Sequence, residues 1–113
     1  MFAGISHSLS GVAAAQAKIT TAAHNISNAH TAEFKKTRTI VEESGSGGVQ
    51  VTQHSQASHV QGASGDLFEQ EYSHVNLEEE VVNLLIAKRS FEVNVKAIDL
   101  QDQAIGTLLD IIE

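Results

Sequence analysis

Histidine is the residue type in this chain best suited to metal binding or acid–base chemistry. No two histidines have the HExxH spacing of a zinc site, and no cluster of carboxylates frames them. We therefore expect exposed polar side chains, and a small metalloenzyme using His54 and His59 is the weakest of three functional hypotheses. The six histidines are His7, His24, His30, His54, His59 and His74.

Other catalytic patterns are missing from the sequence as well. Serine, histidine and aspartate occur, but a GxSxG nucleophile turn does not. The absence of cysteine excludes thiol catalysis, disulfides and cysteine-ligated zinc. No Lys-Ser or Lys-Thr follows Gly45–Gly48, so this run predicts a turn and not a phosphate loop. The sequence therefore predicts no catalytic residue, no metal or other cofactor, no small-molecule substrate and no enzyme activity.

The charge of the 113-residue chain is negative and unevenly distributed. Residues 1–41 hold four bases and one acid (4 − 1 = +3), whereas residues 42–113 hold three bases and thirteen acids (3 − 13 = −10). Nucleic acid is not an expected partner, because duplex binding needs a basic face. The two parts can attract each other within one chain or between chains. The basic cluster Lys35, Lys36 and Arg38 is either a solvated strand edge or a partner for acids of a neighbouring subunit.

Two segments have the apolar periodicity of long helices. Residues 2–28 and 76–112 each carry apolar residues at alternating steps of three and four, which is a heptad pattern. Asn76 is placed to cap the second helix, and Gln16, Lys88 and Asp102 interrupt the two patterns as register devices or solvent-facing residues. The predicted seams are Phe2, Ile5, Leu9, Val12, Gln16, Ile19, Ala23 and Ile26, and Leu77, Val81, Leu84, Lys88, Phe91, Val95, Ile98, Asp102, Ile105, Leu109 and Ile112.

The middle of the chain has a different character. Residues 35–54 contain two short β-prone runs around a Gly/Ser-rich loop, which predicts a β-hairpin. Residues 55–75 are polar and have no sustained period, so we expect an extended arm or loop. The predicted fold is mainly α, a single domain over residues 1–113. Its long terminal helices form an antiparallel, coiled-coil-like pair, with the hairpin and the arm between them.

A pair of helices buries only one stripe of each partner, so the remaining apolar surface requires other subunits. No apolar run approaches the length of a membrane span, and no basic, apolar leader of a secretory signal opens the chain. The residues that we expect at subunit interfaces are Leu9, Val12, Val82, Leu85, Ile86, Leu100, Leu108 and Ile111.

Both ends of the chain resemble the bacterial flagellar rod and hook proteins. Residues 23–36, AHNISNAHTAEFKK, are similar to the family's N-terminal signature A-x-N-[IL]-[AS]-N-x-x-T-x-G-[FY]-K. Residues 75–94 are similar to its C-terminal pattern N-V-[DN]-x-x-E-E-M-x-[ND]-[LM] followed by A-x-R-x-[YF]-E-x-N, and residues 48–51 match a G-V-x-V strand. The matching residues are Asn25, Asn28, Thr31, Phe34, Asn76, Glu79, Glu80, Arg89, Phe91 and Asn94.

One departure from the signature concerns the backbone. The family has glycine where this chain has Glu33, and glycine permits a positive φ. We therefore expect the turn after Thr31 to have a different shape here.

The resemblance implies a structural subunit of the flagellar basal-body rod, with other rod subunits, further copies of itself and the flagellar export apparatus as partners. Such proteins are exported without a cleaved signal and stack in the periplasm. The short middle of the chain is most similar to a proximal-rod protein of the FlgC type. The alternative is a cytoplasmic coiled-coil adaptor that binds partner helices through the same seams.

Overall fold

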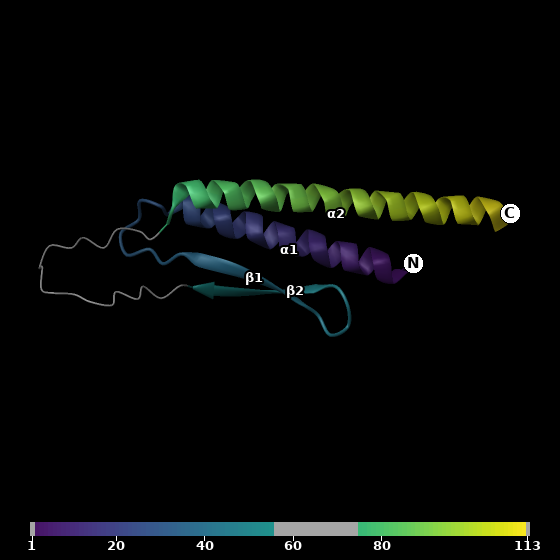
Figure 1. Ribbon diagram of the computed structural model, residues 1–113, viewed down its shortest axis with the longest axis horizontal. Helices are drawn as coiled ribbons and strands as arrows, with labels where there is room; N and C mark the ends of the chain where they lie inside the picture. The colour runs from purple at the N-terminus through teal and green to yellow at the C-terminus, as the bar shows by residue number, and fades with distance from the viewer. Residues whose placement is uncertain (1, 56–74, 113) are drawn as a thin grey trace, which may run out of the picture.

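The computed structural model describes residues 2–55 and 75–112, which form two helices and a hairpin between them (Figure 1). Helix α1 spans Phe2–Ser27, strand β1 Thr37–Glu43, strand β2 Val49–Ser55 and helix α2 Leu77–Ile112. The predicted mainly α-helical fold with a small antiparallel hairpin is confirmed. Ser55, predicted to begin the arm, belongs to β2, and the rest of the predicted arm up to residue 74 lies outside the described residues.

The two helices run antiparallel and give the chain an elongated shape. Gly4 of α1 lies beside Gln101 of α2, and Gly11 lies beside Asn94, so residue n of α1 is level with residue 105 − n of α2. Because α1 begins at Phe2, level with residue 103, residues 104–112 of α2 extend beyond the N-terminus of α1 (Figure 1). The radius of gyration is 20.0 Å, whereas a compact chain of this length would have about 13 Å.

The contact between the helices is rotated from the predicted seams, and that prediction is wrong in part. Leu9, Val81 and Val95 were expected in the seam and are exposed. Smaller and more polar residues replace them, because small side chains let the two backbones approach closely. The helix seam contains Gly4, Ser8, Gly11, Ala15, Ala22 and Asn25 of α1 and Glu80, Leu84, Ala87, Phe91, Asn94, Ile98 and Gln101 of α2.

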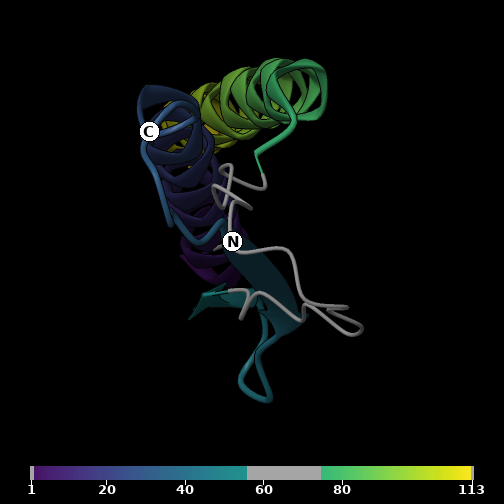
Figure 2. The ribbon, with the colours of Figure 1, turned by 90° about the vertical axis from the view of Figure 1, so that its left-hand side faces the viewer.

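The hairpin packs on α1 and not on α2 (Figure 2). Strand β1 pairs with β2 in an antiparallel register in which Val41 lies opposite Val51. The Thr39 hydroxyl is hydrogen-bonded to that of Thr21 on α1 at 2.6 Å. At the other end of the hairpin, the backbone N–H of Val49 donates to Ser10 Oγ at 3.1 Å. The hairpin is therefore fastened along α1 by polar contacts.

The predicted Gly/Ser-rich turn lies between the strands at residues 44–48. It is closed by hydrogen bonds between Ser44 and Gly48 and between Gly47 and Ser44. Gly47 and Gly48 adopt φ of 88° and 79°, the region that glycine enters without strain. Of the apolar residues that the structure describes, the fully buried ones are alanines: Ala14, Ala15, Ala22 and Ala87. Few large apolar side chains are thus protected from water inside the chain.

Candidate assembly site

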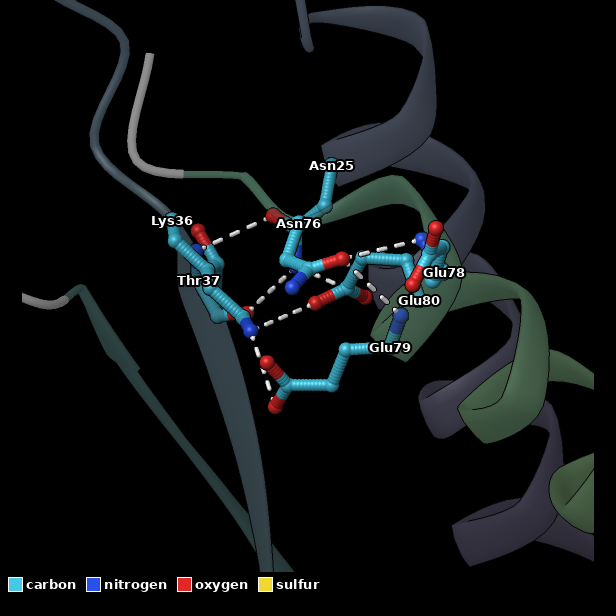
Figure 3. A network of polar contacts seen from close by, with 7 residues as sticks. All are labelled: Asn25, Lys36, Thr37, Asn76, Glu78, Glu79 and Glu80. Carbon is cyan, nitrogen blue, oxygen red and sulfur yellow. Dashed lines mark hydrogen bonds and ion pairs between the residues drawn. The ribbon is translucent and has the colours of Figure 1, made fainter.

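The end of α1 is joined to the start of the hairpin by a buried asparagine. Asn25 is only 1% exposed, and its Nδ2 donates to the carbonyl oxygen of Thr37 at 2.8 Å. The N–H of Thr37 donates back to Asn25 Oδ1 at 3.0 Å, so one amide satisfies both backbone groups of the residue that begins β1. Asn25 Nδ2 also lies 3.3 Å from Glu80 Oε2 of α2. Asn25 therefore connects α1, the hairpin and α2 (Figure 3).

Lys36 completes this polar junction, which we define as Asn25, Lys36, Thr37, Glu79 and Glu80. The Lys36 ammonium lies 2.8 Å from Glu80 Oε1 and 3.1 Å from Glu79 Oε1 (Figure 3). Burial alone would lower the pKa of Lys36, but hydrogen bonds and charge attraction from Glu80 and Glu79 outweigh it and raise that pKa above its usual 10.5. The expected attraction between the basic and acidic parts is thus observed within one chain, and Lys36 is neither solvated nor free to bind a neighbour.

The start of α2 is fixed by the cap that the sequence predicted. Asn76 Oδ1 accepts hydrogen bonds from the N–H groups of Glu78 at 3.0 Å and Glu79 at 3.3 Å. Glu78, Glu79 and Glu80 lie in the first turn, where the helix dipole favours anions. This arrangement presents Glu80 to the junction.

The segment after α1 uses the next two motif residues. Asn28 Nδ2 donates to the carbonyl oxygen of His24 at 2.9 Å and satisfies one of the free carbonyls at the helix end. Thr31 Oγ1 donates to Asn28 Oδ1 at 3.2 Å. Phe34 contacts the His24 ring edge-on, with centroids 5.4 Å apart. The motif residues therefore shape the path from α1 to the hairpin.

Glu33 adopts φ = 59°, which is rare for a residue with a side chain. Glu33 thus adopts a conformation of the kind that glycine would permit at this position. The backbone holds a left-handed residue in the turn after Thr31, and the strain at Glu33, of the order of 1–2 kcal/mol, is offset by the surrounding contacts.

The remaining motif residues lie on α2. Phe91 is half-buried in the helix seam, and Asn94 lies beside Gly11 while its Nδ2 donates to the carbonyl oxygen of Ser90. Arg89 is exposed and pairs with Glu92 at 3.1 Å. These residues are not gathered into one site with the junction.

The residues that we expected at subunit interfaces are exposed, except for the half-buried Val12. Their exposed fractions range from 44% to 74%. Most of the expected interface residues on α2 share one side of the helix, and Leu85 points to another side. Val93 lies on the shared side as well, and the sequence analysis did not include it. We name this side the outer stripe: Val82, Ile86, Val93, Leu100, Leu108 and Ile111.

Four of the six histidines lie among the described residues. His7, His24, His30 and His54 are exposed, whereas His59 and His74 lie outside the described residues. Within residues 2–55 and 75–112, His, Asp and Glu side chains form no group that would hold a metal ion. Neither described helix is apolar enough over its length to cross a membrane.

Comparison with known proteins bears on α2 and the residues before it. Residues 69–111 match the family described as flagellar basal body rod FlgEFG protein C-terminal. None of the curated proteins compared with the chain matches it. The matched segment contains the cap of α2, both glutamates of the polar junction and the outer stripe. By this match, residues 69–111 are similar to the C-terminal part of flagellar basal-body rod proteins.

Proposed function

We propose that the chain is a subunit of the flagellar basal-body rod that polymerises through its terminal helices with other rod subunits and further copies of itself. The outer stripe is the observation that carries this proposal. Its six residues lie along a 36-residue helix, and all of them are exposed. Exposed aliphatic side chains that recur on one side of a helix mark a surface that another protein covers.

A rod must be stiff along its axis and open at its ends. Head-to-tail contacts that repeat from one subunit to the next without closing build such a helix, whereas self-complementary contacts build closed dimers. The outer stripe runs along most of α2, so a neighbour bound there would be held over several helical turns. The polar junction supports this role because it fixes α1, the hairpin and α2 relative to one another.

We further propose that the chain is exported from the cytoplasm by the flagellar export apparatus without a cleaved signal and is assembled in the periplasm. The family match supports a place in the basal body. The matched description names FlgEFG proteins, while the short middle of the chain supports a proximal position of the FlgC type.

Deletion of the gene in the source bacterium tests the function as a whole. We expect loss of swimming and basal bodies that lack a complete rod in electron micrographs, with both restored by the intact gene. Normal swimming with complete rods would contradict the proposal. An intact chain that remains in the cytoplasm during fractionation would favour the coiled-coil adaptor.

Substitution of Ile86 tests the outer stripe. Ile86→Asp should leave export unchanged and reduce incorporation into purified rods at least about tenfold, because an unpaired carboxylate would be buried in an apolar contact. Ile86 is 61% exposed, so the fold of the subunit should tolerate the change. Ile86→Met, which keeps the side chain apolar, is the matched control and should incorporate normally. Recovery of Ile86→Asp in rods at the wild-type level would rule out this face.

A further inference from the structure

A second row of residues on α2 is separate from both the helix seam and the outer stripe. It repeats every seven residues. Four of its members follow the seam positions Glu80, Ala87, Asn94 and Gln101 by one residue, and the fifth, Leu109, follows Leu108. Each of these four members therefore points about 100° around the helix from those seam positions, and the row lies about 40–60° from the seam residues Leu84, Phe91 and Ile98. All five are exposed. We name this the back row: Val81, Lys88, Val95, Asp102 and Leu109.

The residue types of the back row are arranged symmetrically about its central residue. Val95 is its centre, and the two charged residues, Lys88 and Asp102, lie seven residues to either side with opposite signs. The outermost members, Val81 and Leu109, are both aliphatic. A second copy in the opposite direction would place Val95 on Val95, each Lys88 opposite an Asp102, and each Val81 opposite a Leu109. Every position then meets a chemically suitable partner.

The charges of this row are incompletely paired within one chain. Among residues 2–55 and 75–112, Lys88 forms an ion pair with Glu92 on the same helix, at 4.0 Å, and the Lys88 side chain is 68% exposed. Asp102 is exposed and forms no ion pair with any residue in 2–55 or 75–112. Charges at heptad positions lower the affinity of a seam but select its register and direction.

We propose that the free chain forms an antiparallel dimer through the back row of α2, with two Lys88–Asp102 ion pairs placed symmetrically about Val95. A parallel arrangement in register would place Lys88 against Lys88 and Asp102 against Asp102, which is repulsive. A surface that binds a second copy of itself in this way must be self-complementary, whereas a surface that binds a different protein need not be. These arguments favour a second copy as the occupant.

Such a dimer is distinct from the contacts of a rod. It is isologous and closes on itself, whereas a rod grows by contacts that repeat in one direction. The dimer therefore covers apolar side chains of α2 in the chain before assembly. It does not depend on the proposed function, because it concerns the purified chain in solution.

Charge exchange tests the pairing, with sedimentation equilibrium of the purified full chain as the measurement. Lys88→Asp alone and Asp102→Lys alone each turn both ion pairs into like-charge pairs, and we expect each to weaken the dimer at least about tenfold. An equimolar mixture of the two variants restores both pairs in a heterodimer and should associate within about threefold of the wild type. Arg89→Asp makes the same charge change one residue away, where the side chain is 84% exposed, and should leave the dimer unchanged.

Cysteine cross-linking tests the direction, since the chain contains no native cysteine. Lys88→Cys mixed with Asp102→Cys should give a mixed disulfide dimer in the antiparallel arrangement, and Lys88→Cys alone should give little. A homodisulfide of Lys88→Cys would instead indicate a parallel pair and overturn the proposal. A wild-type chain that is monomeric at all concentrations, or a mixture of charge variants that does not associate although both are helical by circular dichroism, would also overturn it. A negative result in these tests would not affect the proposed rod function, and a negative result in the rod assay would not affect the proposed dimer.

Discussion

At the scale of single residues, the two glutamates that hold Lys36 differ in exposure. The Glu80 side chain is 3% exposed and that of Glu79 is 47% exposed. Loss of a buried partner leaves the remaining charge without compensation, whereas an exposed pair contributes little. We expect Glu80→Ala to lower the free energy of unfolding by about 3 kcal/mol and Glu79→Ala by less than about 1 kcal/mol. Urea denaturation followed by circular dichroism measures both, and equal effects would show that burial does not govern the junction.

The raised pKa of Lys36 makes the junction sensitive to alkaline pH. Because this pKa is higher in the folded chain than its ordinary 10.5, the ammonium contributes its full stability below about pH 10.5 and loses it as the pH rises through the folded value. The wild type should therefore lose stability relative to Lys36→Arg as the pH rises above about 10.5, since arginine stays charged there. The measurement is the urea midpoint of each protein as a function of pH. If the midpoints of the wild type and Lys36→Arg fell in parallel as the pH rose, the result would contradict this assignment.

The motif residues of the junction could be selected from the sequence, but their contacts could not. Asn25, Glu79 and Glu80 follow from the resemblance at the two ends of the chain. The pairing of Lys36 with Glu80 joins residues 44 positions apart (80 − 36) and depends on how the hairpin leaves α1. Nothing local in the sequence encodes that path, because Glu33 adopts a backbone conformation that its residue type disfavours.

At the scale of elements, the helix seam depends on a close approach at Gly11. A β-carbon added there would lie 2.5 Å from Asn94 Oδ1, which is closer than the atoms can tolerate. Gly11→Ala should therefore destabilise the helix pair in the wild type. An Asn94→Ala background removes the three atoms nearest to the added β-carbon, and there the same change should stabilise the chain by up to about 1 kcal/mol, the helix-propensity difference.

A double-mutant cycle measured by thermal unfolding gives the coupling between these two positions. Gly106→Ala is the control, since no atom lies within 4 Å of the added β-carbon. It should raise helicity or leave stability unchanged in both backgrounds. Additive effects of Gly11→Ala and Asn94→Ala would mean that the two side chains do not meet.

The positions of the helices could be predicted from the sequence, but the residues that form the contact between them could not. Each helix carries two rows of residues with the same heptad period, one aliphatic and one small or polar. Periodicity alone does not distinguish the rows, and the larger residues, such as Leu9 and Val81, were the expected seam. The row of Gly4, Ser8, Gly11 and Ala15 has the same steps of four and three, and its small size was the signal that the backbones approach each other there.

At the scale of the whole molecule, the described part of the chain is a scaffold whose apolar residues lie mostly on its outside. The buried apolar residues described are four alanines, while Leu, Ile and Val side chains line the outer stripe and the back row. Two apolar faces on one helix allow one chain to meet different partners at different stages. The match of residues 69–111 to rod proteins and the exposed apolar faces make assembly the first activity to measure.

The four-alanine interior has a calorimetric consequence. The heat-capacity change of unfolding grows with the apolar surface that unfolding exposes, and 113 residues of an ordinary domain would give about 1.4–1.7 kcal/mol/K. We expect differential scanning calorimetry of the monomeric chain to give a clearly smaller value and a broad transition. Isothermal titration calorimetry of subunits added to growing rods should show the complementary effect, a large negative heat-capacity change. Assembly would bury the apolar surface that remains exposed to solvent in the folded monomer.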